Sequence, residues 1–133
     1  MIHKYLTIEK IRFEERLDFT IETDKQALEK EIPFFITQPL VENSIKHGLF
    51  NNPDGIKLKF RVMYIPNRLT LEVSNTGRLS HEWHMGVGLT NVLERLENCF
   101  PGRFDFSLRE SEDLVIAKIS IVLKNEKIHF ADH

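Results

Sequence analysis

The sequence predicts an α/β sandwich (α+β), in which helices cover one face of a mixed, mostly antiparallel sheet. Segments with helical residue spacing alternate with segments that have the spacing of strands, in the order helix, strand, helix, two strands, helix, two strands. Hairpins therefore outnumber strand–helix–strand units, which favours antiparallel pairing. With 41% hydrophobic and 29% charged residues, we expect residues 1–133 to form one globular domain.

A leader helix and a strand are expected at the start of the chain. Residues 1–16 place Tyr5, Ile8 and Ile11 at helical spacing. The next segment, 17–23, alternates apolar and polar residues, as a strand with one buried face does.

A longer helix is expected from about Pro33 to His47, because proline suits the first turn of a helix. Gly48 is expected to cap its C-terminal end, and the turn-forming stretch 51–55 follows. One face of this helix carries the apolar or small residues Leu40, Val41, Ser44 and Ile45.

The second half of the chain is expected to form two hairpins with a helix between them. Alternation predicts strands at 56–64, 69–73, 104–108 and 114–123. The first pair reads as a hairpin with one face in water, and the last strand is apolar enough for a central position in the sheet. Between the pairs, apolar residues at helical spacing predict a helix from Leu89 to Phe100, ended by a Pro-Gly pair.

The composition excludes several classes of protein. A net charge of −2 without a basic stripe gives no case for nucleic-acid binding. The single cysteine, Cys99, cannot form an intramolecular disulfide, so a reducing compartment is expected. No apolar run has membrane-spanning length, and the N-terminus lacks the apolar segment of a signal peptide. We therefore expect a cytoplasmic domain, or such a piece of a larger protein.

The polar face of the helix at 33–47 is the first candidate site. Asn43, Lys46 and His47 lie three and four positions apart, so their side chains converge on one patch. An amide oxygen can bind Mg²⁺, and a lysine can hold phosphate oxygens. Taken alone, a solvated face with a Glu42–Lys46 ion pair is the more common outcome of this pattern.

Two further segments suit contact with a ligand. In VSNTG (73–77), Asn75 is expected to point out of the strand end, and Gly77 would let the backbone approach a ligand closely; a plain turn is the alternative. In GVGLTNVLERL (86–96), Gly86 and Gly88 would expose backbone N–H groups to a phosphate at the start of a helix. A glycine-bearing loop is the alternative there, since neither the P-loop nor the dinucleotide-binding pattern is complete.

Together, the order and spacing of these three segments resemble the N, G1 and G2 boxes of the GHKL ATPases. Within them, the chain resembles the catalytic ATP-binding domain of LytS/YehU-type sensor histidine kinases. Three segments carry this resemblance, namely YLTIEKIRFEERL, IPFFITQPLVENSIKHG and GVGLTNVLERL. The resemblance covers about residues 4–123.

The resemblance implies ATP and Mg²⁺ as ligands. It assigns Asn43 to Mg²⁺ and, with Lys46, to catalysis. It assigns the residues Lys46, His47, Asn75, Gly77, Gly86, Val87, Gly88 and Leu89, together with Asn43, to the nucleotide. Residues 78–85 would be a short lid over ATP.

The chain departs from the family pattern at G1 and near the last strands. Asn75 stands where an aspartate usually accepts a hydrogen bond from the adenine, and Leu79 replaces the second glycine of G1. A Gly-Thr pair near the last strands is also missing. An asparagine still offers a carbonyl acceptor, although an uncharged one, so we expect lowered rather than lost affinity.

The sequence does not support hydrolysis of ATP. Hydrolytic members of the superfamily place a glutamate four residues before the N-box asparagine, where this chain has Pro39. Glu42 directly precedes Asn43, so on a helix the two side chains point about a hundred degrees apart. Phosphoryl transfer to another group is therefore expected.

The resemblance places the phosphorylated histidine outside this chain, on a dimerisation domain of the same kinase. It implies a membrane-anchored homodimer with this domain in the cytoplasm, and a response regulator of the LytTR type as phosphate acceptor. Two alternatives remain. One is a degenerate domain that acts as a regulatory or interaction module without ATP turnover. The other is an anti-sigma-type serine kinase, which the leader YLTIEKIRFEERL fits less well.

Overall fold

Helices and one sheet account for most of the computed structural model, which describes residues 2–23, 34–78 and 87–123. The elements are α1 (Ile2–Phe13), the short 3-10 helix η1 (Glu14–Arg16), β1 (Leu17–Thr23), α3 (Phe34–Asn51), β2 (Ile56–Ile65), β3 (Arg68–Thr76), α4 (Val87–Cys99), β4 (Phe104–Ser111) and β5 (Leu114–Val122). Their order is the one that the sequence predicts. No helix in these ranges is long and apolar enough to cross a membrane.

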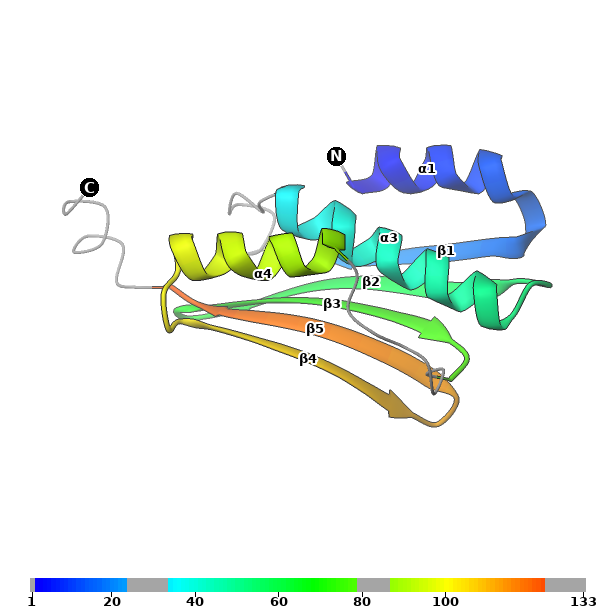
Figure 1. Ribbon diagram of the computed structural model, residues 1–133. Helices are drawn as coiled ribbons and strands as arrows, with labels where there is room; N and C mark the ends of the chain where they lie inside the picture. The colour runs from blue at the N-terminus through cyan, green and yellow to red at the C-terminus, as the bar shows by residue number, and fades with distance from the viewer. Residues whose placement is uncertain (1, 24–33, 79–86, 124–133) are drawn as a thin grey trace.

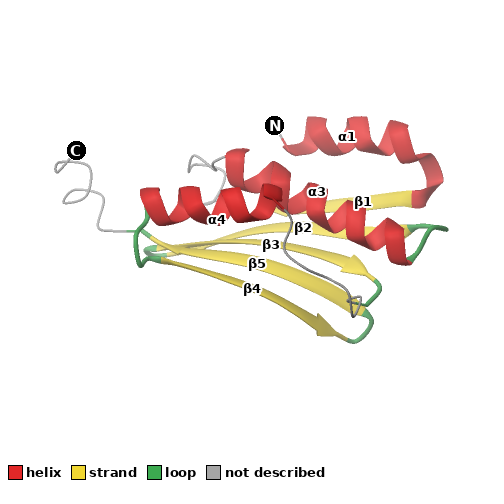
Figure 2. Cartoon of the chain, in the orientation of Figure 1, coloured by secondary structure: helices red, strands yellow, loops and turns green. Residues whose placement is uncertain are grey.

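The sheet has the strand order β1-β2-β3-β5-β4. β1 and β2 pair in parallel, and the other neighbours pair antiparallel. The helices α1, α3 and α4 all lie on one side of the sheet (Figures 1 and 2). The predicted α/β sandwich with a mixed, mostly antiparallel sheet is therefore confirmed, including the central position of β5.

The core lies between the helices and the sheet. Every second residue of β2 and β3 faces the helices, as the alternating pattern predicts. The buried side chains include Phe60, Val62, Leu71, Val73 and Ile119 from the sheet, and Leu40, Val41, Ile45, Val92 and Leu96 from the helices. The apolar face predicted for the helix at 33–47 is thus confirmed as the face that packs.

The opposite face of the sheet carries charged side chains. The Glu22 carboxylate lies 2.9 Å from Lys59 Nζ and 3.2 Å from Arg61 Nε, and Arg61 also reaches Glu72 at 3.3 Å. The hydrogen bond from Lys59 lowers the pKa of the exposed Glu22 carboxyl. Exposed pairs of this kind add little to stability.

The leader helix packs on a different face from the one that its isoleucines suggest. Leu6 is fully buried, whereas Ile8 and Ile11 are 63% and 72% exposed. Tyr5 and Phe13 pack at the edge of the core. The helix is confirmed, but its residue spacing alone did not identify the buried side.

The prediction that Gly48 ends its helix is wrong. α3 continues to Asn51, and the backbone N–H of Asn52 donates to Gly48 O at 2.9 Å. A Cβ at Gly48 would lie 2.9 Å from Ile56 Cδ1 and 3.0 Å from Asn75 Nδ2. The helix does not end at Gly48, and the absence of a side chain there suits the close approach of α3 to β2 and β3.

Replacing Gly48 by alanine is therefore expected to destabilise the fold. Crowding of a packed core costs about 1–3 kcal/mol, and the better helix propensity of alanine returns at most about 1 kcal/mol of that. Gly88→Ala is the matched control, since nothing lies within 4 Å of a Cβ at this other helical glycine. Urea unfolding of the two variants measures the difference, and equal stability would contradict the close approach.

Candidate functional site

The polar face of α3 is accessible beside the core. Asn43 and His47 are half-buried and Lys46 is exposed, while Val41, Ser44 and Ile45 are buried. Neither Asn43 nor Lys46 uses its side chain in a hydrogen bond or ion pair with the described residues. The Asn43 amide and the Lys46 ammonium are thus free to meet a ligand.

The predicted Glu42–Lys46 ion pair does not form in the described part of the chain. Glu42 is exposed and lies close enough to Tyr5 of the leader helix to affect its hydroxyl. Burial raises the pKa of Tyr5 most, and the carboxylates of Glu9 and Glu42 raise it further. Glu42 therefore keeps a carboxylate without an ionic partner among the described residues.

The sequence predicts that Asn75 points out of the strand end, and this prediction is wrong. Asn75 lies inside β3. Its side chain is 3% exposed and lies on the helix-facing side with Val73. Its Nδ2 donates to Thr76 O at 3.0 Å. If the amide were flipped, Asn75 Oδ1 would face Thr76 O, and two acceptors cannot bond to each other. The hydrogen bond therefore fixes the orientation of the amide and leaves Oδ1 as the acceptor for a ligand.

Gly77 connects three segments of the chain. Its φ of +128° is a conformation that few side chains tolerate, and a Cβ there would lie 2.5 Å from Asn52 Nδ2. Its N–H donates to Asp113 O at 2.7 Å, from the turn between β4 and β5. Within the described residues, the neighbour that requires a glycine here is thus the Asn52 side chain, and the expected contact of Gly77 with a nucleotide stays a prediction.

The sequence analysis did not identify the residues that hold the segment 77–78 after β3. Asn51 Nδ2 donates to Arg78 O at 3.3 Å, and Arg78 forms an exposed ion pair with Asp113 at 2.8 Å. Asn51 and Asn52 appear in the sequence only as part of a turn, and nothing in the spacing links Asp113 to residues 77–78. These contacts depend on the sheet topology, which brings the β4–β5 turn beside the end of β3.

The glycine-rich segment is described only in part. Gly86 and residues 79–85 of the expected lid lie outside the described residues. α4 begins at Val87, Gly88 is exposed, and Leu89 is buried. The Leu89 side chain thus belongs to the core, so only its backbone could face a phosphate.

The donor set fits Mg²⁺ bound largely by a substrate. No group of three or more His, Cys, Asp or Glu side chains among the described residues could hold a metal ion. Mg²⁺ bound with nucleotide phosphates needs only one or two protein oxygens and keeps several waters. The uncommitted Asn43 amide oxygen is suitable for this.

No family model matches the chain. Among curated proteins, it is 30% identical to the sensor histidine kinase YesM of Bacillus subtilis over 135 aligned residues, which cover 96% of this chain and 23% of YesM. It is also 30% identical to the sensor histidine kinase BtsS of Escherichia coli, over 80% of this chain and 19% of BtsS. The chain thus spans about a fifth of the length of the curated relatives it matches.

Solved structures show the same fold. The catalytic domain of histidine kinase ThkA aligns with a TM-score of 0.66 at 22% identity, covering 89% of this chain and 86% of that domain. The histidine kinase domain of a blue-light activated kinase from Erythrobacter litoralis aligns with a TM-score of 0.71 at 14% identity, covering 98% of this chain and 63% of that one.

Gly77→Ala is expected to lower the free energy of unfolding by about 1–3 kcal/mol, because the positive φ is strained for alanine and the new Cβ meets Asn52. In the Gly77→Ala/Asn52→Ala double variant the steric part disappears. A double-mutant cycle by urea unfolding should then give a favourable coupling of about 1 kcal/mol. Strict additivity of the two single changes would show that Asn52 does not pack on Gly77.

Proposed function

The chain is a homologue of the sensor histidine kinases and has the fold of their catalytic domains, and from this premise we propose that it binds ATP with Mg²⁺ and donates the γ-phosphoryl group to a histidine. One observation carries the proposal. The close approach of α3 to β3 at Gly48 brings the polar face of α3 to the strand that holds Asn75 and that ends just before Gly77. A phosphate-binding helix and a base-binding strand thereby adjoin.

Each site residue then has a physical role. Asn43 would supply an amide oxygen to Mg²⁺, which neutralises charge on the phosphates when bound. Lys46 would hold phosphate oxygens, and His47 would contact the nucleotide. Asn75 Oδ1 would accept from the adenine amino group, and Gly77 would allow the base to approach the backbone.

The start of α4 would complete the phosphate site. Gly86, Val87, Gly88 and Leu89 would offer backbone N–H groups, which point outward at a helix N-terminus and attract phosphate. Gly88 is exposed, as this role needs.

Transfer is favoured over hydrolysis. Pro39, four residues before Asn43, has no group that could activate water. In phosphoryl transfer the protein mainly positions ATP and neutralises charge, while the acceptor attacks in line. That acceptor would be a histidine on a dimerisation domain of the same kinase.

A solved complex of a structural neighbour supports a proposal about the partners. ThkA has been seen in a complex with the response regulator TrrA, and we propose a response regulator, of the LytTR type, as the partner of this protein. The same reasoning suggests a membrane-anchored homodimer with this domain in the cytoplasm.

A degenerate regulatory module is the second candidate. Asn75 in place of aspartate and Leu79 in place of glycine favour it. Such a module would keep the packing described above without productive ATP binding, so nucleotide titration separates the two.

The decisive measurement is titration of a fluorescent ATP analogue with and without Mg²⁺. The unmodified domain is expected to bind at millimolar concentration or tighter, and more tightly with Mg²⁺. Asn43→Ala should remove the Mg²⁺ dependence, whereas Asn98→Ala, at an exposed position near the other end of α4, should keep it. Absence of binding to the unmodified domain would favour the regulatory module.

A further inference from the structure

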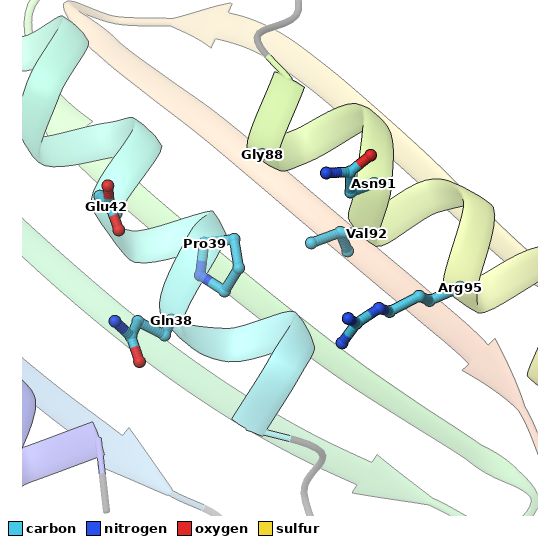
Figure 3. Close-up of a pocket in the computed structure, with 7 residues that line it drawn as sticks. All are labelled: Gln38, Pro39, Glu42, Gly88, Asn91, Val92 and Arg95. Carbon is cyan, nitrogen blue, oxygen red and sulfur yellow. The ribbon is translucent and has the colours of Figure 1, made fainter.

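A cavity of about 280 Å³ lies between the first half of α3 and α4 (Figure 3). Gln38, Pro39 and Glu42 line it from α3, and Gly88, Asn91, Val92 and Arg95 line it from α4. None of the roles proposed above uses the α3 side of this cavity.

The polar groups of the cavity come from both helices. Gln38 and Glu42 are one turn apart on α3, and Asn91 and Arg95 are one turn apart on α4. Pro39 and the buried Val92 add an apolar surface between them. A flat, partly apolar ring with N–H groups at its edge matches this combination of apolar and polar surfaces.

The cavity adjoins the phosphate end of the proposed nucleotide site. Gly88 lines it and also belongs to the expected phosphate-binding segment. Glu42 directly precedes Asn43, but its side chain points to another side of the helix. A group held in the cavity would therefore stand beside the phosphates without displacing Mg²⁺ from Asn43.

We propose that this cavity receives the imidazole of the phosphate-accepting histidine, and that the Glu42 carboxylate accepts a hydrogen bond from its second ring nitrogen. This inference rests on the proposed function. A neutral imidazole attacks through one nitrogen only if the other carries the proton, so a carboxylate that accepts from that N–H selects the reactive tautomer. Glu42 can do this because no described residue pairs with it.

The free ring nitrogen forms a bond to the γ-phosphorus, the bond from that phosphorus to the bridging oxygen breaks, and its electron pair leaves with ADP. The ring becomes positively charged, and Glu42 offsets this charge while the N–H bond stays intact. The proton then leaves to water.

The occupant is a segment of the same kinase rather than an unrelated ligand. The chain covers only 23% of YesM and 19% of BtsS, so those relatives have long regions beyond the part that aligns here. The carboxylate of Glu42 and the amides of Gln38 and Asn91 complement the N–H groups of such a segment.

The test uses the kinase chain that carries both this domain and its histidine region. Glu42→Gln and Glu42→Ala are expected to slow phosphorylation of the histidine by γ-labelled ATP about tenfold or more, while the dissociation constant of ATP changes less than twofold. Glu42→Asp should recover part of the rate. Glu94→Gln, on the exposed surface of α4 outside the cavity, is the matched control and should behave as the unmodified kinase.

A second variant tests the cavity itself. Gln38→Trp should fill it and block phosphorylation while ATP still binds, whereas Glu94→Trp should not. Normal phosphorylation in Glu42→Gln and Gln38→Trp, with ATP bound, would overturn this inference and leave the proposed function intact. An unmodified kinase that binds no ATP would instead overturn the proposed function, and this inference with it.

Discussion

The contact of Gly48 with Ile56 and Asn75 is the constraint on which the site depends. A Cβ at position 48 would meet the side chains of both neighbours at about 3 Å, so any larger residue there requires Ile56 and Asn75 to shift. The same contact sets the distance between the polar face of α3 and the end of β3. The packing of the core and the position of the polar face of α3 therefore depend on the same residue, so a substitution at Gly48 affects both.

The fold and the division of α3 into two faces could be predicted from sequence, because both depend on local periodicity. That pattern predicted the strands β2 and β3 and the buried residues Leu40, Val41 and Ile45. Gly48 was misread because a glycine after a helical run has the same local pattern whether it caps the helix or touches a sheet. The buried position of Asn75 and the contacts of Asn52 and Asp113 depend on tertiary neighbours, which no spacing along the chain reports.

Two carboxylates differ in what their surroundings do to them. Glu22 on the outer face of the sheet is matched by Lys59 and Arg61, and its negative charge is balanced there. Glu42 on α3 has no such partner among the described residues and lies beside a cavity. Placing an unbalanced charge at an accessible edge costs little in water, and it leaves the charge for a partner to use.

The parallel pairing of β1 with β2 has a consequence for folding. The hairpins β2–β3 and β4–β5 join neighbouring strands of the sequence, but β1 must wait until α3 has formed and crossed the sheet. Closing that longer loop costs more chain entropy, so the antiparallel strands should assemble first and the N-terminal segment should join them last. As an edge strand that pairs only with β2, β1 would also detach under load without breaking the antiparallel pairs. A pull or twist applied through the leader helix could thus be released at β1 without melting the four strands behind it.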